Sequence, residues 1–81
     1  MAAKLTFRYD KVGDILYIDK CLPYKEQDGG MIGAETAVRT NPTTGEVETI
    51  ELLFFKKRLD EGECIELPVD AKIELTEEAL L

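Results

Sequence analysis

Two aspartates, Asp10 and Asp14, stand four residues apart around a short stretch that contains Gly13. Carboxylates held close together can bind a divalent cation or act as an acid–base pair. Aspartates at the edges of turns also accept hydrogen bonds from backbone N–H groups, and the spacing favours this second role. We expect Asp10 and Asp14 to secure a turn.

Glu51 interrupts an apolar run whose composition predicts a central strand. A carboxylate that faces protein there needs a cationic partner, because an unpaired buried charge is costly. The candidate partners are Arg8, Arg39 and Lys57. Tyr17 lies in another apolar run, and we expect it to pack with its hydroxyl in water rather than to donate a proton.

Groups that commonly carry catalysis are scarce in this chain. It has no histidine, which removes the commonest neutral-pH base and transition-metal ligand. Cys21 and Cys64 lack a base that would activate them, so we predict two reduced, buried or half-buried thiols. We expect no catalytic residue, no cofactor and no metal, and hold four residues as candidates for contacting a partner: Asp10, Asp14, Tyr17 and Glu51.

The charge of the chain argues against anionic ligands. Its formal net charge is −7 over 81 residues, so phosphate backbones and anionic membranes should be repelled. The basic cluster Lys56–Arg58 fits a solvated face or a helix C-terminus equally well. Gly29–Gly33 lacks the spacing and the lysine of a phosphate-binding loop. We predict binding to neither nucleic acid nor membrane.

Composition also bounds the domain and its location. The longest apolar stretch, Leu52–Phe55, is far too short to cross a bilayer, and we see no signal peptide. We expect a cytoplasmic protein. With no linker, repeat or change of composition, residues 1–81 are predicted to form a single domain.

The first third of the chain predicts a hairpin. Apolar and polar residues alternate in Leu5–Tyr9, Asp10–Asp14 supplies turn chemistry, and Ile15–Ile18 is a second β-rich run. Because Ile15–Ile18 is apolar on both faces, we expect it to be central in the sheet. Asp19–Gly30 shows little periodicity and is predicted to be a mobile surface loop.

The middle of the chain predicts a second hairpin. Met31–Thr40 is strand-like, Asn41–Gly45 is a strong turn, and Val47–Phe54 forms the return arm. A change to helical spacing then predicts a short helix over Phe55–Glu63, with Gly62 as its stop.

The last third carries the most regular alternation. Apolar and polar residues alternate throughout Ile65–Leu75, which predicts one edge strand or two short strands separated at Pro68. Thr76–Leu81 predicts a capped helical turn. The fold class is therefore α+β and mostly β, an antiparallel meander or hairpin sheet of about four to six short strands with one short helix.

Two segments, Tyr9–Ile18 and Gly45–Leu53, resemble a small prokaryotic family of domains of unknown function, family twenty-two eighty-three. The family pattern is Y-D-x-x-x-D-x-L-Y-I followed later by G-I-E-I-L, and Thr49 stands here where the family has glycine. The matching positions are Tyr9, Asp10, Asp14, Leu16, Tyr17, Ile18, Ile50 and Glu51. The resemblance implies no assigned activity, although some members are suspected antitoxin-like partners of small toxins.

Two hypotheses of function follow from these observations. The first is a non-enzymatic protein-interaction module that forms a homo-oligomer or binds a small protein partner, in an antitoxin-like version a basic one. The second is a small-ligand or divalent-cation binding protein, or a hydrolase, that uses Asp10, Asp14 and Glu51 as clustered carboxylates.

Overall fold

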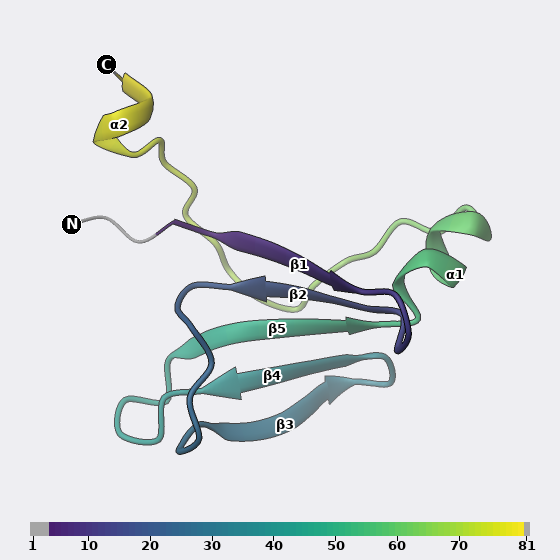
Figure 1. Ribbon diagram of the computed structural model, residues 1–81, viewed down its shortest axis with the longest axis horizontal. Coiled ribbons are helices and arrows are strands. Elements are labelled where there is room, and N and C mark those ends of the chain that lie inside the picture. Colours follow the sequence, from purple (N-terminus) through teal and green to yellow (C-terminus); the bar gives the residue numbers. More distant parts are fainter. Residues whose placement is uncertain (1–3, 81) are drawn as a thin grey trace.

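The computed structural model describes residues 4–80 and contains one five-stranded antiparallel sheet followed by two short helices (Figure 1). The elements are β1 (Thr6–Asp10), β2 (Ile15–Asp19), β3 (Asp28–Gly33), β4 (Thr36–Thr40), β5 (Val47–Leu53), α1 (Phe55–Asp60) and α2 (Glu77–Leu80). The predicted fold class, mostly β with hairpins and a short helix, is confirmed. No helix within residues 4–80 is long and apolar enough to span a membrane.

Strand β5 occupies the centre of the sheet, whose order is β1-β2-β5-β4-β3. The hairpin β1–β2 lies on one side of β5 and the hairpin β3–β4 on the other, and all neighbouring pairs are antiparallel. The last strand in the sequence therefore joins two hairpins that precede it. The central places predicted for Ile15–Ile18 and for the strand that carries Glu51 are both confirmed.

The strand register separates an apolar face from a polar one. Across β2, β5 and β4, Leu16 lies opposite Leu52, and Ile18 opposite Ile50, which in turn lies opposite Val38. We call the side of the sheet that carries these residues the apolar face. Side chains alternate along a strand, so the residues between them lie on the other side, the polar face.

The second hairpin departs from the prediction on its first arm. Met31–Thr40 is not one strand, because Ala34 and Glu35 form a turn between β3 and β4. Strand β3 begins at Asp28, inside the segment predicted to be loop. Glycines there weaken the strand signal in the sequence, since glycine has low strand propensity. The turn at Asn41–Gly45 is confirmed, with Gly45 at φ 75°.

The connection from β2 to β3 is shorter than the predicted mobile loop, and hydrogen bonds attach it to the sheet. The backbone N–H of Lys20 donates to the carbonyl of Glu48 at 2.8 Å. The hydroxyl of Tyr24 donates to the Glu48 carboxylate at 2.5 Å, and the amide of Gln27, a buried residue, donates to it at 3.0 Å. One carboxylate on β5 therefore fastens this connection to the sheet.

Helix α1 follows β5 after a sharp change of direction at Phe54, which has φ 54°. The helix ends at Asp60, three residues before the predicted end. The predicted stop at Gly62 lies just beyond it, with φ 80°. Glycine adopts this left-handed conformation without the steric cost that a side chain brings. The terminal helical turn predicted over Thr76–Leu81 forms as α2, while Leu81 lies outside the described residues.

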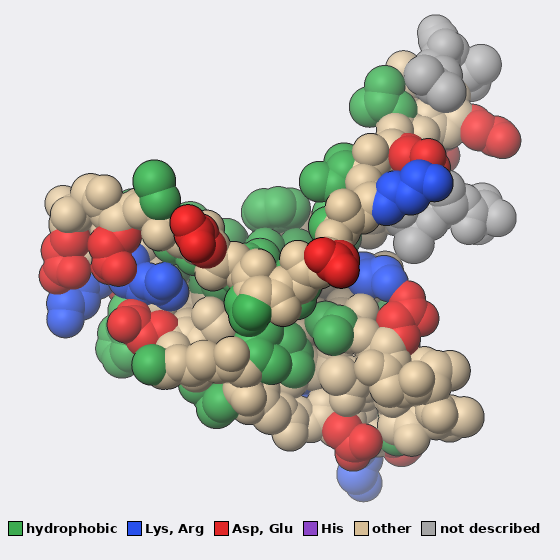
Figure 2. Space-filling view, turned by 180° about the vertical axis from the view of Figure 1, so that it is seen from behind, with side chains coloured by type: hydrophobic (Ala, Val, Ile, Leu, Met, Phe, Trp, Pro, Cys, Tyr) green, Lys and Arg blue, Asp and Glu red, His purple; other side chains and the backbone are tan. Residues whose placement is uncertain are grey.

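The strand predicted over Ile65–Leu75 is wrong, because residues 63–76 form no regular secondary structure. Pro68 explains the failure: it has no N–H for a strand ladder, and the Val69 N–H turns back onto the Leu67 carbonyl at 2.8 Å. The segment instead crosses hydrophobic side chains on one side of the molecule (Figure 2). Ile65 and Leu67 are half-buried there.

Candidate functional site

Asp10 holds the β1–β2 turn. Its Oδ1 accepts hydrogen bonds from the backbone N–H groups of Val12 at 3.0 Å and Gly13 at 3.2 Å. A Cβ at Gly13 would lie 2.8 Å from Asp10 Oδ2, so glycine gives the carboxylate its room. The turn role expected for Asp10 is confirmed.

Asp14 connects the same turn to helix α1. Its carboxylate accepts a hydrogen bond from the Tyr9 hydroxyl at 2.7 Å. It also accepts the N–H groups of Lys56 at 2.8 Å and Lys57 at 3.3 Å, while its carbonyl accepts the N–H of Phe55. Those N–H groups open the helix and have no partner within it. Asp14 thus caps a helix that lies far from it in the sequence.

The capping also sets the protonation of both side chains. The hydrogen bond from Tyr9, followed by that from the Lys56 N–H, holds the pKa of Asp14 below its ordinary value. The same bond to Asp14 raises the pKa of Tyr9. Hydrogen bonds to a carboxylate favour its charged form, so Asp14 is ionised at neutral pH. Its oxygens already accept hydrogen bonds from Tyr9, Lys56 and Lys57.

Asp19 is the most enclosed carboxylate on the polar face, with 6% of its side chain exposed. Arg8 donates to it through Nε at 2.5 Å and Nη2 at 3.3 Å, a two-pronged contact across the β1–β2 pair. The Thr49 hydroxyl donates to the same carboxylate at 3.0 Å. The hydrogen bonds from Arg8 hold the pKa of Asp19 below its usual value and raise that of the arginine.

Tyr17 and Glu51, two of the predicted site residues, lie directly opposite each other on β2 and β5. The Arg8 guanidinium lies over the Tyr17 ring, 4.4 Å from its centre. Arg39 Nε is 3.1 Å from the Glu51 carboxylate, which confirms one of the three predicted partners. We call these residues, together with Asp19 and Thr49, the polar network, which contains the ion pairs Arg8–Asp19 and Arg39–Glu51.

The four predicted residues therefore fall into two separate places. Asp10 and Asp14 share the turn, and Tyr17 and Glu51 share the polar network. From ideal strand spacings the backbones of Asp10 and Glu51 lie about 12 Å apart, and their carboxylates are held by different partners. Within residues 4–80 no three acidic or cysteine side chains are grouped as metal ligands would be.

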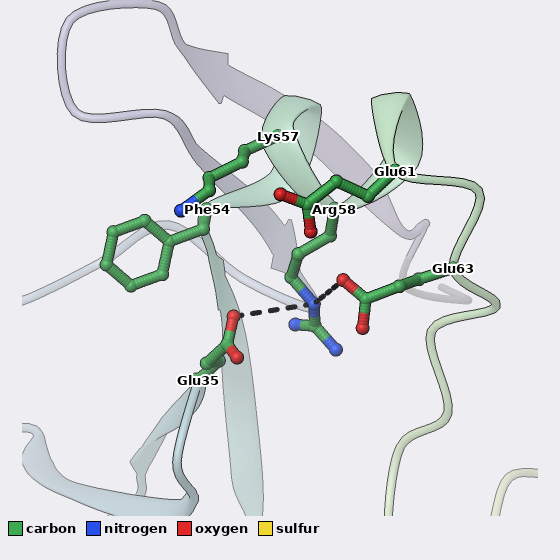
Figure 3. Close-up of a pocket in the computed structure, with 6 residues that line it drawn as sticks. All are labelled: Glu35, Phe54, Lys57, Arg58, Glu61 and Glu63. Atoms are coloured by element: carbon green, nitrogen blue, oxygen red, sulfur yellow. Dashed lines mark ion pairs between the residues drawn. The ribbon is translucent and has the colours of Figure 1, made fainter.

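A depression next to α1 contains Arg58, to which the sequence assigned no role beyond the basic cluster Lys56–Arg58. It has a volume of about 220 Å³ and is lined by Glu35, Phe54, Lys57, Arg58, Glu61 and Glu63 (Figure 3). Arg58 Nε lies 3.6 Å from Glu35 and 3.8 Å from Glu63. These are ion pairs but too long for hydrogen bonds, and Nε and Nη1 are buried without a hydrogen-bond partner.

The basic cluster Lys56–Arg58 is dispersed by α1. Lys56 pairs with Asp60 at 2.7 Å, Lys57 lies near the Phe54 ring, and Arg58 enters the depression with 14% of its side chain exposed. The three cations therefore do not present one basic surface. The helix C-terminus that the sequence offered as one interpretation is found for Lys57 and Arg58, which occupy the last turn of α1.

Both cysteines are free thiols, as predicted, but the expectation that they are buried or half-buried is wrong. Cys21 lies in the β2–β3 connection and Cys64 in the irregular C-terminal segment, and neither segment is enclosed by the sheet. Partial loss of hydration around the sulfur, together with the nearby carboxylates of Glu48 and Asp19, raises the pKa of Cys21 and keeps it in the less reactive thiol form.

The family resemblance of Tyr9–Ile18 and Gly45–Leu53 stays a prediction. Its motif positions are distributed between the turn and the polar network, where their side chains hold the hairpin, the helix and the sheet together. Comparison of the chain with protein-family models, curated proteins and solved structures found no match.

Proposed function

We propose that this chain is a non-enzymatic, cytoplasmic protein-interaction module that associates with itself or with a small protein partner. The observation that carries the proposal is the imbalance between its buried and exposed apolar side chains. Among the described residues only Val38 and Leu52 are buried hydrophobic residues, whereas thirteen large hydrophobic residues are exposed. Single exposed apolar residues are ordinary, but contiguous ones mark contact surfaces.

Exposed apolar residues occur on two segments, at the start of β1 and before α2, whose ends are linked by an ion pair. Leu5 and Phe7, at the start of β1, have 54% and 63% of their surfaces exposed, and Ile73 and Leu75 have 84% and 69%. An ion pair of 2.6 Å between Lys4 and Glu78 joins the ends of these two segments. We call Leu5, Phe7, Ile73 and Leu75 the terminal apolar cluster.

The state of the carboxylates supports a non-enzymatic function. Asp10 and Asp14 accept hydrogen bonds from backbone N–H groups, and Glu51 pairs with Arg39. A general base must be free to reach a substrate proton, and a metal ligand must have open lone pairs. These carboxylates are committed to holding the fold, which disfavours the cation-binding and hydrolase alternative.

The test is light scattering combined with affinity capture from lysate of the native cell, using the full chain and two matched variants. Phe7→Ser removes an exposed ring from the terminal apolar cluster. Val12→Ser removes an apolar side chain that is 99% exposed in the β1–β2 turn, away from that cluster. Capture of a protein partner should be lost in Phe7→Ser and kept in Val12→Ser. A monomeric wild-type chain that captures no protein would refute the proposal.

An antitoxin-like partner is one version of this module. The net charge of −7 suits a basic partner, and the resemblance to family twenty-two eighty-three points in the same direction. In that version, co-expression of this chain relieves the growth defect caused by a small basic toxin, and Phe7→Ser does not.

A further inference from the structure

Strand β3 is an outer edge of the sheet with an unusual composition. Its sequence is Asp-Gly-Gly-Met-Ile-Gly, and all six residues are exposed. Within residues 4–80 it pairs with β4 on one side only, so its other side presents unpaired backbone N–H and C=O groups. Such an edge can accept another strand by backbone hydrogen bonding.

The three glycines of β3 are not required by the fold of a single chain. None has the positive φ that favours glycine, in contrast to Gly45 and Gly62. A Cβ at Gly30 or Gly33 would meet no atom within 4 Å, and one at Gly29 would lie 4.0 Å from a single carbonyl. Glycine inside a strand weakens it and often marks a place where another backbone approaches closely.

The two outer strands of the sheet differ in how they are protected. Strand β1 carries Arg8 and Asp10 within its five residues, and charged side chains discourage edge-to-edge pairing. Strand β3 has no charge after Asp28. Its bulge lies between Met31 and Gly33, which leaves Asp28–Met31 in regular register with β4. The β3 edge is therefore in regular register over Asp28–Met31 and uncharged beyond Asp28, whereas β1 carries charges at Arg8 and Asp10.

We propose that β3 pairs antiparallel with β3 of a second copy of this chain, so that the two sheets become one. The inference rests on the proposed interaction function and gives its self-association a site. A two-fold axis perpendicular to the sheet places the apolar faces of both copies on the same side. In the register we propose, this axis lies between the two copies of Gly30. Gly30 then faces its own copy, and Met31 of each chain lies opposite Gly29 of the other.

Side-chain size and charge both suit this register. Met31 is 57% exposed in the single chain, and the glycine opposite leaves space for its side chain. The two Asp28 residues stand at opposite ends of the paired segment, about 14 Å apart from ideal strand spacings. That separation exceeds the screening length of about 8 Å at physiological salt, so their repulsion is small. The segment is therefore self-complementary.

The test uses charge at the two-fold axis. Gly30→Lys and Gly30→Glu each place two like charges opposite each other in the dimer, in a position that is open in the single chain. By sedimentation equilibrium each variant alone should dimerise at least about tenfold more weakly than wild type, because like charges across an interface are strongly unfavourable. An equal mixture of the two should form heterodimers. Thr6→Lys, on the opposite edge strand, is the matched control and should leave dimerisation unchanged.

The concentration range extends from about 5 µM to about 500 µM, since a single strand pair makes a small and weak interface. Hydrogen exchange on the wild-type chain is a second measurement that needs no substitution: the amides within Gly29–Met31 that point away from β4 should exchange more slowly at the higher concentration. A wild-type chain that stays monomeric throughout, Gly30→Lys that dimerises like wild type, or a mixture that stays monomeric would overturn the proposal. If the monomer still captures a protein through Phe7, β3 pairing fails while the interaction function stands.

Discussion

Replacing Asp19 by alanine should be among the most damaging single changes in the sheet. The substitution removes the two hydrogen bonds from Arg8 and leaves the Thr49 hydroxyl, on a residue only 1% exposed, without its acceptor. A hydrogen bond to a charged group contributes about 1.5 to 3 kcal/mol, and a stranded buried donor costs about 1 to 3 kcal/mol. The lower values of both energy ranges apply to Asp19, because 46% of the side chain of its partner Arg8 is exposed to water.

We therefore expect Asp19→Ala to lower the free energy of unfolding by about 2 to 4 kcal/mol. A domain of this size has only about 3 to 5 kcal/mol available from its core, so the variant should be close to unfolded at 25 °C. Urea unfolding followed by circular dichroism measures the loss, since the chain has no tryptophan. With a slope near 1 kcal/mol per molar urea, the midpoint should fall by at least about 2 M.

A double-mutant cycle with Thr49→Val separates the two contributions. Alone, Thr49→Val should cost about 1 kcal/mol, the net value of one hydrogen bond. In the Asp19→Ala background it removes the stranded hydroxyl, so it should cost nothing or restore stability. Additive losses in the cycle, or an Asp19→Ala variant within about 0.5 kcal/mol of wild type, would refute the account of the polar network.

The pH dependence of the same comparison follows from the lowered pKa of Asp19. A carboxyl whose pKa is lower in the folded state than in the unfolded state stabilises the fold above its unfolded pKa of about 3.9. That stability is lost as the pH falls through the folded pKa. The difference between wild type and Asp19→Ala should therefore shrink below about pH 4, and a constant difference would contradict the ion pair.

Three further predictions concern the turn, the β2–β3 connection and the glycines. Asp14→Ala should lower the thermal midpoint more than Asp14→Asn, because asparagine tolerates the positive φ of 55° and keeps one acceptor for the helix N–H groups; equal midpoints would exclude the capping role. The hydrogen bond to Glu48 raises the pKa of Tyr24 to about 12, so the stability that this bond gives is present below about pH 10 and lost as the pH rises towards 12. Tyrosinate absorbance should show a late-titrating phenol that Tyr24→Phe removes, and its persistence in that variant would assign it elsewhere. Gly45→Ala should cost about 1 kcal/mol because φ is 75° there, whereas Gly33→Ala should be neutral or slightly stabilising; urea midpoints distinguish the two, and equal losses would show that φ is not the cause.

Local patterns were sufficient to predict the β1–β2 and β4–β5 hairpins with their turns, but not the β3–β4 hairpin. Alternation in Leu5–Tyr9 and Ile15–Ile18 and the turn residues at Asn41–Gly45 act within a few residues, where sequence signals are strongest. The alternation of Ile65–Leu75 was misleading because a strand needs a partner as well as a pattern. Pro68 bends that segment, and no neighbouring strand within the described residues supplies a ladder.

The site residues show the same division between local and distant contacts. The turn role of Asp10 is local and was predicted, whereas the capping of α1 by Asp14 joins residues over forty positions apart. Arg8 and Asp19 had a detectable signal, since the register of the predicted hairpin places them on one face of adjacent strands. The pairing of Arg58 with Glu35 had none, because these residues come together only through the placement of α1.

The position of β5 between the two hairpins has a consequence for how this chain folds as it is synthesised. Strand β2 pairs with β5 through contacts such as Ile15 to Leu53, and β4 pairs with the opposite side of the same strand. Until β5 has left the ribosome, only two isolated hairpins can form, and isolated hairpins are marginally stable in water. The sheet therefore assembles late and in one cooperative step. A nascent chain that ends before Val47 should remain sensitive to protease, and one that extends beyond α1 should acquire resistance abruptly.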